Sequence, residues 1–213
     1  MDIRKNIANL TTFIRTYLIF VVICFLNSPS FILRVAGAVL LMLAAILDGV
    51  DGYFARRYRS YNKFGGIIDT LGDRITENIL LIFFAYKQLI PLWIPLIVVA
   101  RSFVSDFIRL ICFRSGAGTF DINRSKWGFI LVASKPSRFL YLAFKIYVFL
   151  LGSIVLCVSN PGGTANNINI NVLLHLKASL FYSSWVLVGL NLLRFALLIF
   201  DARDLLKKEL LNR

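Results

Sequence analysis

Six long apolar runs constrain the fold of this chain more than any other feature. They lie near residues 8–27, 31–55, 65–87, 91–113, 139–158 and 178–200. A helix of about 20 apolar residues spans the roughly 30 Å hydrocarbon core of a bilayer. The 58% share of hydrophobic residues also exceeds the value of about one half that is usual for soluble domains. The sequence therefore predicts an all-α, polytopic membrane protein with six transmembrane helices, in which residues 1–213 form a single domain.

The positions of the basic residues predict how these helices are oriented. Basic residues are concentrated at the N-terminus, in the connections at 56–63 and 114–138, and in the tail 201–213, whereas the three intervening connections carry almost none. The positive-inside rule therefore places both termini and the second and fourth connections in the cytoplasm. This distribution explains the net charge of +13 through contacts with membrane lipids, so no nucleic-acid partner is expected. The tail has helical periodicity and is expected to lie along the membrane surface.

Four aspartates are concentrated where the second and third apolar runs meet. Asp48 and Asp51 are three residues apart, and Asp69 and Asp73 are four apart, so each pair shares one face of its helix. Two antiparallel helices joined by a short polar turn can direct all four carboxylates into one pocket near the cytoplasmic boundary. Such a cluster would repel itself without a counter-charge. Oxygen ligands of this kind favour hard divalent ions such as Mg²⁺, Mn²⁺ or Ca²⁺.

Glycines and an arginine surround these aspartates. Gly52 and Gly65 lack side chains, which allows a helix or a ligand to approach the backbone closely. Arg56 lies one turn past Gly52 and is suited to bind a phosphate. Together these residues predict a metal-dependent site for a phosphorylated ligand at the membrane surface. The alternative is that the acids form structural ion pairs with the neighbouring arginines 56, 57 and 74.

Residues 48–56 (DGVDGYFAR) and 65–73 (GGIIDTLGD) carry a resemblance to a known family. They match the signature Asp-x2-Asp-Gly-x2-Ala-Arg-x8-Gly-x3-Asp-x3-Asp at every specified position, and this signature is typical of CDP-alcohol phosphotransferases. The resemblance implies a homodimeric enzyme with six transmembrane helices that binds two divalent ions, Mg²⁺ or Mn²⁺. It implies transfer of a phosphatidyl group from a CDP-linked lipid such as CDP-diacylglycerol to a hydroxyl acceptor, with release of CMP, in phospholipid biosynthesis.

The same resemblance implies roles for individual residues. Asp48, Asp51, Asp69 and Asp73 are the expected metal ligands, and Asp73 is also the expected general base toward the acceptor hydroxyl. The residues expected to line the CDP pocket are Gly52, Ala55, Arg56 and Gly65.

The acceptor is indicated by a second, shorter resemblance. Residues 90–109 and 125–128 are similar to the fourth span and the following loop of phosphatidylglycerophosphate synthases, and residues 6–15 (NIANLTTFIR) resemble the start of those enzymes. Ser102 replaces the glutamate of that pattern, and Phe129 replaces a second lysine. Glycerol 3-phosphate is therefore the favoured acceptor, and inositol phosphate or another alcohol is the alternative. The residues expected to bind a phosphorylated acceptor are Arg109, Lys126, Lys135 and Arg138.

Two functions of other classes remain open on the residues alone. A cation-coupled transporter would use the acids as an ion site, but it would place them near the membrane midplane between two structural repeats. The sequence has no evident internal repeat, and its aspartates lie beside a connection that is expected to face the cytoplasm. A catalytically silent scaffold with the same fold is the second alternative.

Overall fold

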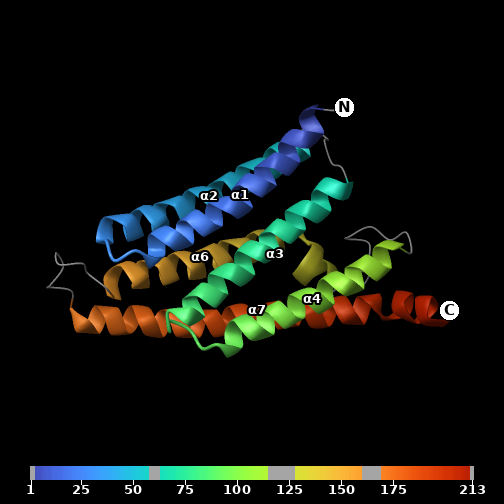
Figure 1. Cartoon of the computed structure of the whole chain (residues 1–213). Helices are drawn as coiled ribbons and strands as arrows, with labels where there is room; N and C mark the ends of the chain where they lie inside the picture. Colours follow the sequence, from blue (N-terminus) through green and yellow to red (C-terminus); the bar gives the residue numbers. More distant parts are fainter. Residues whose placement is uncertain (1–2, 58–62, 115–127, 160–168, 212–213) are drawn as a thin grey trace. The chain divides into compact units, whose positions relative to one another are not determined.

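The described residues form a series of long helices (Figure 1). The computed structural model describes residues 3–57, 63–114, 128–159 and 169–211. Every regular element in these ranges is helical, which confirms the predicted all-α class for this part of the chain. The α-helices are α1 (Ile3–Asn27), α2 (Phe31–Arg57), α3 (Lys63–Tyr86), α4 (Trp93–Arg114), α6 (Lys135–Ser159) and α7 (Ile170–Leu211), and a short π-helix, η1 (Phe129–Ala133), precedes α6.

The helix bounds agree with most of the predicted apolar runs and differ from one of them strongly. The first five runs correspond to α1, α2, α3, α4 and α6, with small shifts at their ends. The sixth run, 178–200, lies inside α7, which is 42 residues long and continues through the tail to Leu211. The glycines and asparagines of residues 159–172 predict a loop over this whole stretch, and this prediction is wrong at its end, because α7 already begins at Ile170. The side-chain oxygen of Asn169 accepts a hydrogen bond from the Asn171 amide at 3.0 Å and so caps this earlier start.

Two helical segments of the described chain are long and apolar enough to cross a membrane by length and composition. They are Lys135–Ser159 and Ile170–Arg203. Two shorter apolar helical stretches, Thr16–Asn27 and Phe31–Ile46, belong to α1 and α2. The number of six transmembrane helices, like the cytoplasmic location of both termini, therefore stays a prediction.

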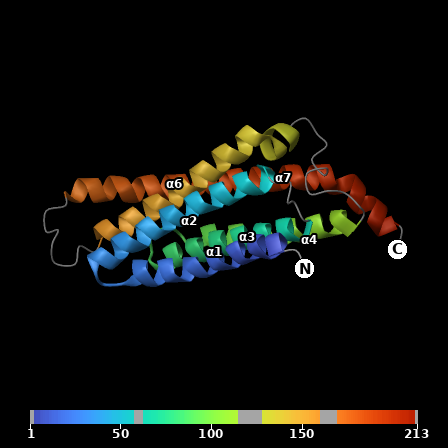
Figure 2. The ribbon, with the colours of Figure 1, turned by 90° about the horizontal axis from the view of Figure 1, so that it is seen from above.

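The chain divides into two compact units. Unit 1 comprises residues 1–91 and 148–181, and unit 2 comprises residues 92–147 and 182–213. In unit 1, α1 packs against both α2 and α3 (Figure 1). The short connection between α1 and α2 lies at the end of unit 1 opposite to the N-terminus (Figure 2). The core of this unit includes Val22 and Leu26 of α1 and Leu80 and Phe84 of α3, all of which are almost inaccessible to solvent.

Two glycines permit close helix packing in unit 1. A Cβ atom on Gly37 of α2 would lie 3.0 Å from the Cβ of Phe25 in α1. A Cβ atom on Gly152 of α6 would lie only 2.6 Å from the Phe84 ring of α3. The Phe84 ring also packs against the ring of Phe149, one turn before Gly152, with 6.4 Å between the ring centres, within the range of about 4.5–7 Å that aromatic pairs prefer. The aromatic side chain of Phe84 thus lies directly against the α6 backbone.

The end of α3 is a backbone motif that normally uses glycine. Gln88 has a positive φ of 56°. The Leu89 amide donates to the Phe84 carbonyl at 3.0 Å, and the Gln88 amide donates to the Ala85 carbonyl at 2.9 Å. This pair of hydrogen bonds defines a Schellman motif, which ends the helix at a left-handed residue.

Candidate active site

The two halves of the aspartate motif lie on consecutive helix ends in unit 1. Asp48 and Asp51 lie in the last three turns of α2, and Asp69 and Asp73 lie in the first three turns of α3. The end of α2 and the start of α3 lie at the same end of unit 1, beside the start of α1 (Figure 1). The two helices run in opposite directions from this point. The backbone therefore brings the end of α2 and the start of α3 to one end of unit 1, as the sequence predicts.

Asp73 is the only one of these four aspartates whose side chain belongs to the described part of the structure, and it is partly buried. The side chains of the other three lie outside that part, although their backbones are helical. The predicted CDP-pocket residues are likewise described only in their helical backbone: Gly52, Ala55, Arg56 and Gly65. Among the side chains that are described, no group of three potential metal ligands occurs. Convergence of the four carboxylates on metal ions therefore stays a prediction.

A buried ion pair lies one turn beyond Asp73 on α3. Glu77 is 2% exposed, and its Oε2 atom lies 3.8 Å from Nη1 of Arg74. A buried carboxylate requires such a partner, because its desolvation is otherwise costly. The alternative to a metal site names Arg74 as an ion-pair partner of the aspartates. In the structure Arg74 forms an ion pair with Glu77.

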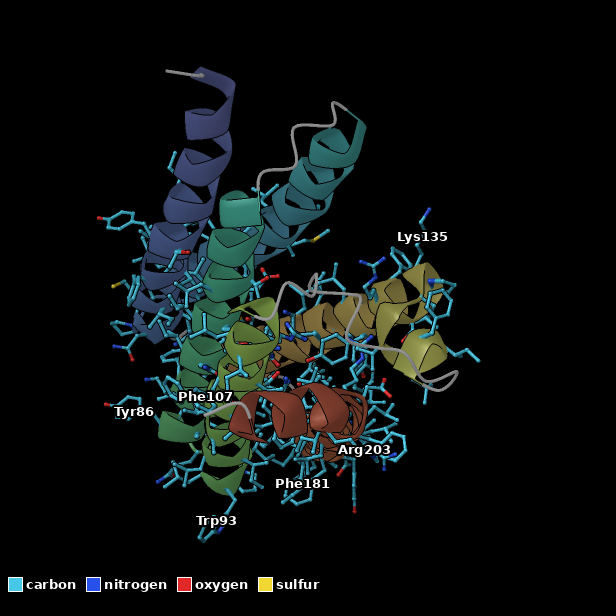
Figure 3. The ribbon with its side chains drawn as sticks, turned by 90° about the vertical axis from the view of Figure 1, so that its right-hand side faces the viewer. Tyr86, Trp93, Phe107, Lys135, Phe181 and Arg203 are labelled. Atoms are coloured by element: carbon cyan, nitrogen blue, oxygen red, sulfur yellow. The ribbon has the colours of Figure 1, made fainter. Side chains whose placement is uncertain are left out.

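The predicted acceptor-binding residues that the structure describes all belong to unit 2. Arg109 lies on α4 and is partly buried, whereas Lys135 and Arg138 lie on the first turn of α6 and are exposed. The Lys135 side chain points outward from the start of α6 (Figure 3). Lys126 lies outside the described residues.

The buried face of α4 is partly polar, a feature that the sequence reasoning did not single out. Arg101, Ser102 and Ser105 are 7%, 3% and 1% exposed, and their spacing places them on one helical face. Ser102, which replaces the expected glutamate, is therefore a buried residue of α4.

Sequence reasoning also missed a polar network in unit 2 that connects η1, α6 and α7. Arg194 of α7 donates to the Leu131 carbonyl from both Nε and Nη2, each at 3.3 Å. The Tyr141 hydroxyl of α6 donates to Oδ1 of Asn191 at 2.8 Å. Asn191 and Arg194 lie three residues apart within the apolar run 178–200. Polar residues in such runs usually have specific partners, so this pair could have indicated the network from the sequence.

Comparison with known proteins identifies the class that this fold and motif define, a class of membrane-embedded transferases. The sequence profile described as CDP-alcohol phosphatidyltransferase matches residues 5–175, which include both halves of the motif. The chain belongs to the CDP-alcohol phosphatidyltransferase family.

Relatives with assigned names fall into more than one acceptor group. The chain is 28% identical over 170 residues to the CDP-diacylglycerol–glycerol-3-phosphate 3-phosphatidyltransferase of Rickettsia bellii, covering 75% of this chain and 90% of that protein. It is 33% identical over 89 residues to the Bacillus subtilis protein of the same name, covering 42% of this chain and 44% of that relative. It is also 29% identical over 122 residues to the archaetidylinositol phosphate synthase of Pyrococcus horikoshii, covering 55% and 62% of the two chains.

Proposed function

We propose that this protein transfers a phosphatidyl group from CDP-diacylglycerol, or a similar CDP-linked lipid, to the hydroxyl group of glycerol 3-phosphate, releasing CMP. The observation that carries the proposal is the complete aspartate motif on the adjoining ends of α2 and α3, in a chain whose family profile covers residues 5–175. Membership of this enzyme family argues against the transporter alternative. The relatives named for glycerol 3-phosphate support the choice of acceptor.

The chemistry of the donor set fits two divalent ions, Mg²⁺ or Mn²⁺. Asp48, Asp51, Asp69 and Asp73 offer only carboxylate oxygens, which hard cations prefer, from helix ends that lie at one end of unit 1. When bound, the ions supply positive charge that stabilises the pyrophosphate and the departing CMP. The four carboxylates would hold that charge between the end of α2 and the start of α3.

The remaining steps belong to residues of the chain itself. Asp73 accepts the proton from the acceptor hydroxyl as the acceptor oxygen attacks phosphorus and the bond to CMP breaks. Gly52, Ala55 and Gly65 leave room for the cytidine nucleotide, and Arg56 contacts its phosphates. The acyl chains of the donor remain in the bilayer during the reaction, which accounts for a membrane-embedded enzyme.

We further propose the topology that the charge distribution favours. The chain crosses the membrane six times with both termini in the cytoplasm, and the active site faces the cytoplasm. The active form is a homodimer, as the family resemblance implies.

The phosphate of the acceptor is bound by Arg109, Lys126, Lys135 and Arg138. Arginine and lysine supply several hydrogen-bond donors as well as charge to a phosphate group. Inositol phosphate is the second candidate acceptor, because the relative from Pyrococcus horikoshii is named for that chemistry and would need a similar basic site.

An assay of CMP release tests this function. Purified protein in mixed micelles would receive CDP-diacylglycerol, Mn²⁺ and one acceptor from a panel of glycerol 3-phosphate, inositol phosphate, inositol, serine and phosphatidylglycerol. We expect release of CMP with glycerol 3-phosphate. Release only with another alcohol would refute the choice of acceptor, and release with none would refute the transferase.

Asp73→Asn tests the proposed base, because an amide cannot accept the proton at neutral pH. We expect its turnover to fall by at least about a hundredfold, the lower end of what general base catalysis contributes. Asp201→Asn on α7 removes a carboxylate outside the motif and serves as the matched control, with turnover close to that of the wild type. Wild-type turnover in Asp73→Asn would exclude this role for Asp73.

A further inference from the structure

The helical path breaks between η1 and α6. Ser134 has an extended backbone, with φ −64° and ψ 145°. Its hydroxyl oxygen accepts a hydrogen bond from the Ser137 amide at 3.4 Å, and its carbonyl accepts one from the Arg138 amide at 3.2 Å. Ser134 therefore acts as the N-cap of α6, and Pro136 follows in the first turn, where its missing N–H group is tolerated.

Because of this break, the last carbonyl groups of η1 cannot accept hydrogen bonds from backbone N–H groups of a continuing helix. Ser134 is extended and Pro136 has no N–H group, so the helical hydrogen-bond pattern cannot continue across this point. The Leu131 carbonyl is satisfied instead by side chains. It accepts hydrogen bonds from Nε and Nη2 of Arg194, both at 3.3 Å, and a short one from the hydroxyl of Ser137. Arg194 also donates from Nη2 to the Ser137 oxygen at 3.1 Å.

A second set of contacts joins the first turns of α6 to α7 around Arg194. The guanidinium carbon of Arg194 lies 4.3 Å from the centre of the Tyr141 ring, in a cation–π arrangement. The Tyr141 hydroxyl donates to Oδ1 of Asn191 at 2.8 Å, and Nδ2 of Asn191 donates to the Leu187 carbonyl at 3.1 Å. Ser137 and Tyr141 are one turn apart on α6, and Asn191 and Arg194 are one turn apart on α7. The junction between η1 and α6 is thus fixed to α7 at two successive levels.

We propose that Arg194 is a positioning residue for the acceptor site. It fixes the η1–α6 junction, and this junction sets the place and direction of the helix turn that carries Lys135 and Arg138. This inference rests on the proposed function, because it assumes that these two residues bind the acceptor phosphate. A rigidly placed pair of cations loses less conformational entropy when the phosphate binds. Arg194 acts through the Leu131 carbonyl and Ser137, not through contact with the acceptor.

The kinetic test compares the KM values of the two substrates. Arg194→Gln removes the paired donors to Leu131, so the acceptor KM should rise by about tenfold while the CDP-diacylglycerol KM stays within about twofold of wild type. Ser137→Ala should raise the acceptor KM in the same direction, because Ser137 links Arg194 to the junction. Arg194→Lys should bring the acceptor KM part of the way back to the wild-type value, because its ammonium group keeps the positive charge and can still donate to the Leu131 carbonyl. Arg203→Gln is the matched control: Arg203 lies on the same helix, 4.7 Å from the Phe200 ring, and the variant should keep both KM values.

A structural test does not depend on catalysis. Hydrogen–deuterium exchange of the amides in residues 129–138 should accelerate in Arg194→Gln and Ser137→Ala, and should remain unchanged in Arg203→Gln. Unchanged exchange in Arg194→Gln overturns the positioning role, whatever the reaction proves to be. A rise in acceptor KM for Arg194→Gln alone, with none for Ser137→Ala, would also overturn it, because it would indicate direct binding of the acceptor. Failure of the wild-type protein to release CMP would instead refute the proposed function.

Discussion

Individual residues decide how closely the helices of unit 1 pack. Gly152 is the clearest case, because the space that a side chain would take is already filled by the Phe84 ring. Gly189 of α7 offers a contrast, since a Cβ atom there would meet nothing within 4 Å. Two helical glycines of the same chain therefore have opposite environments.

Gly152→Ala should destabilise the protein by about 1–3 kcal/mol, the usual cost of forcing an extra group into a filled core. The measurement is the thermal unfolding midpoint of the purified protein in detergent. Gly189→Ala should leave the midpoint unchanged or raise it, because alanine favours helix by about 1 kcal/mol over glycine and meets no obstacle there. Equal midpoints for Gly152→Ala and the wild type would show that Phe84 does not occupy this space.

At the scale of elements, hydropathy and length were sufficient to locate the described α-helices, but not the full extent of α7 or the short π-helix η1. Both halves of the aspartate motif were also placed correctly on the ends of α2 and α3. The start of α7 was missed because Asn169, its cap, lies in an asparagine-rich stretch that resembles a loop. The contact of Arg194 with Leu131 joins residues 63 positions apart, so no local pattern could predict it.

The Schellman motif at the end of α3 predicts a stabilising substitution. Gln88 is exposed and has a positive φ, a conformation that costs residues with a Cβ roughly 1–2 kcal/mol. Gln88→Gly removes this cost but makes the unfolded chain more flexible, which offsets part of the gain. We therefore expect the free energy of unfolding to rise by about 0.5–1 kcal/mol. Gln88→Val should lower it, since a β-branched residue is the least tolerated at positive φ. Thermal midpoints of the two variants in the same detergent would test this, and a lower midpoint for Gln88→Gly would contradict the expectation.

At the scale of the whole molecule, the proposed reaction depends on divalent ions. Treatment of the purified protein with a chelator, followed by its removal, should abolish CMP release, because the four carboxylates alone leave the pyrophosphate without charge compensation. Addition of Mn²⁺ or Mg²⁺ should restore release, whereas Zn²⁺, which prefers nitrogen and sulfur ligands, should restore less. Full activity in the metal-free protein would refute the assignment of the aspartates as ligands.

The length of α7 has a consequence for the surrounding bilayer. The helical segment Ile170–Arg203 contains 34 residues, and its ends are polar, with His175 and Lys177 near one end and Asp201 and Arg203 at the other. At 1.5 Å per residue it is about 51 Å long, well beyond the roughly 30 Å of a hydrocarbon core. Tilts of 0–40° are usual, and even the steepest of these leaves about 39 Å to be accommodated. In the proposed topology the polar ends of this helix therefore project past the acyl chains, where Lys177 and Arg203 can meet lipid headgroups and water.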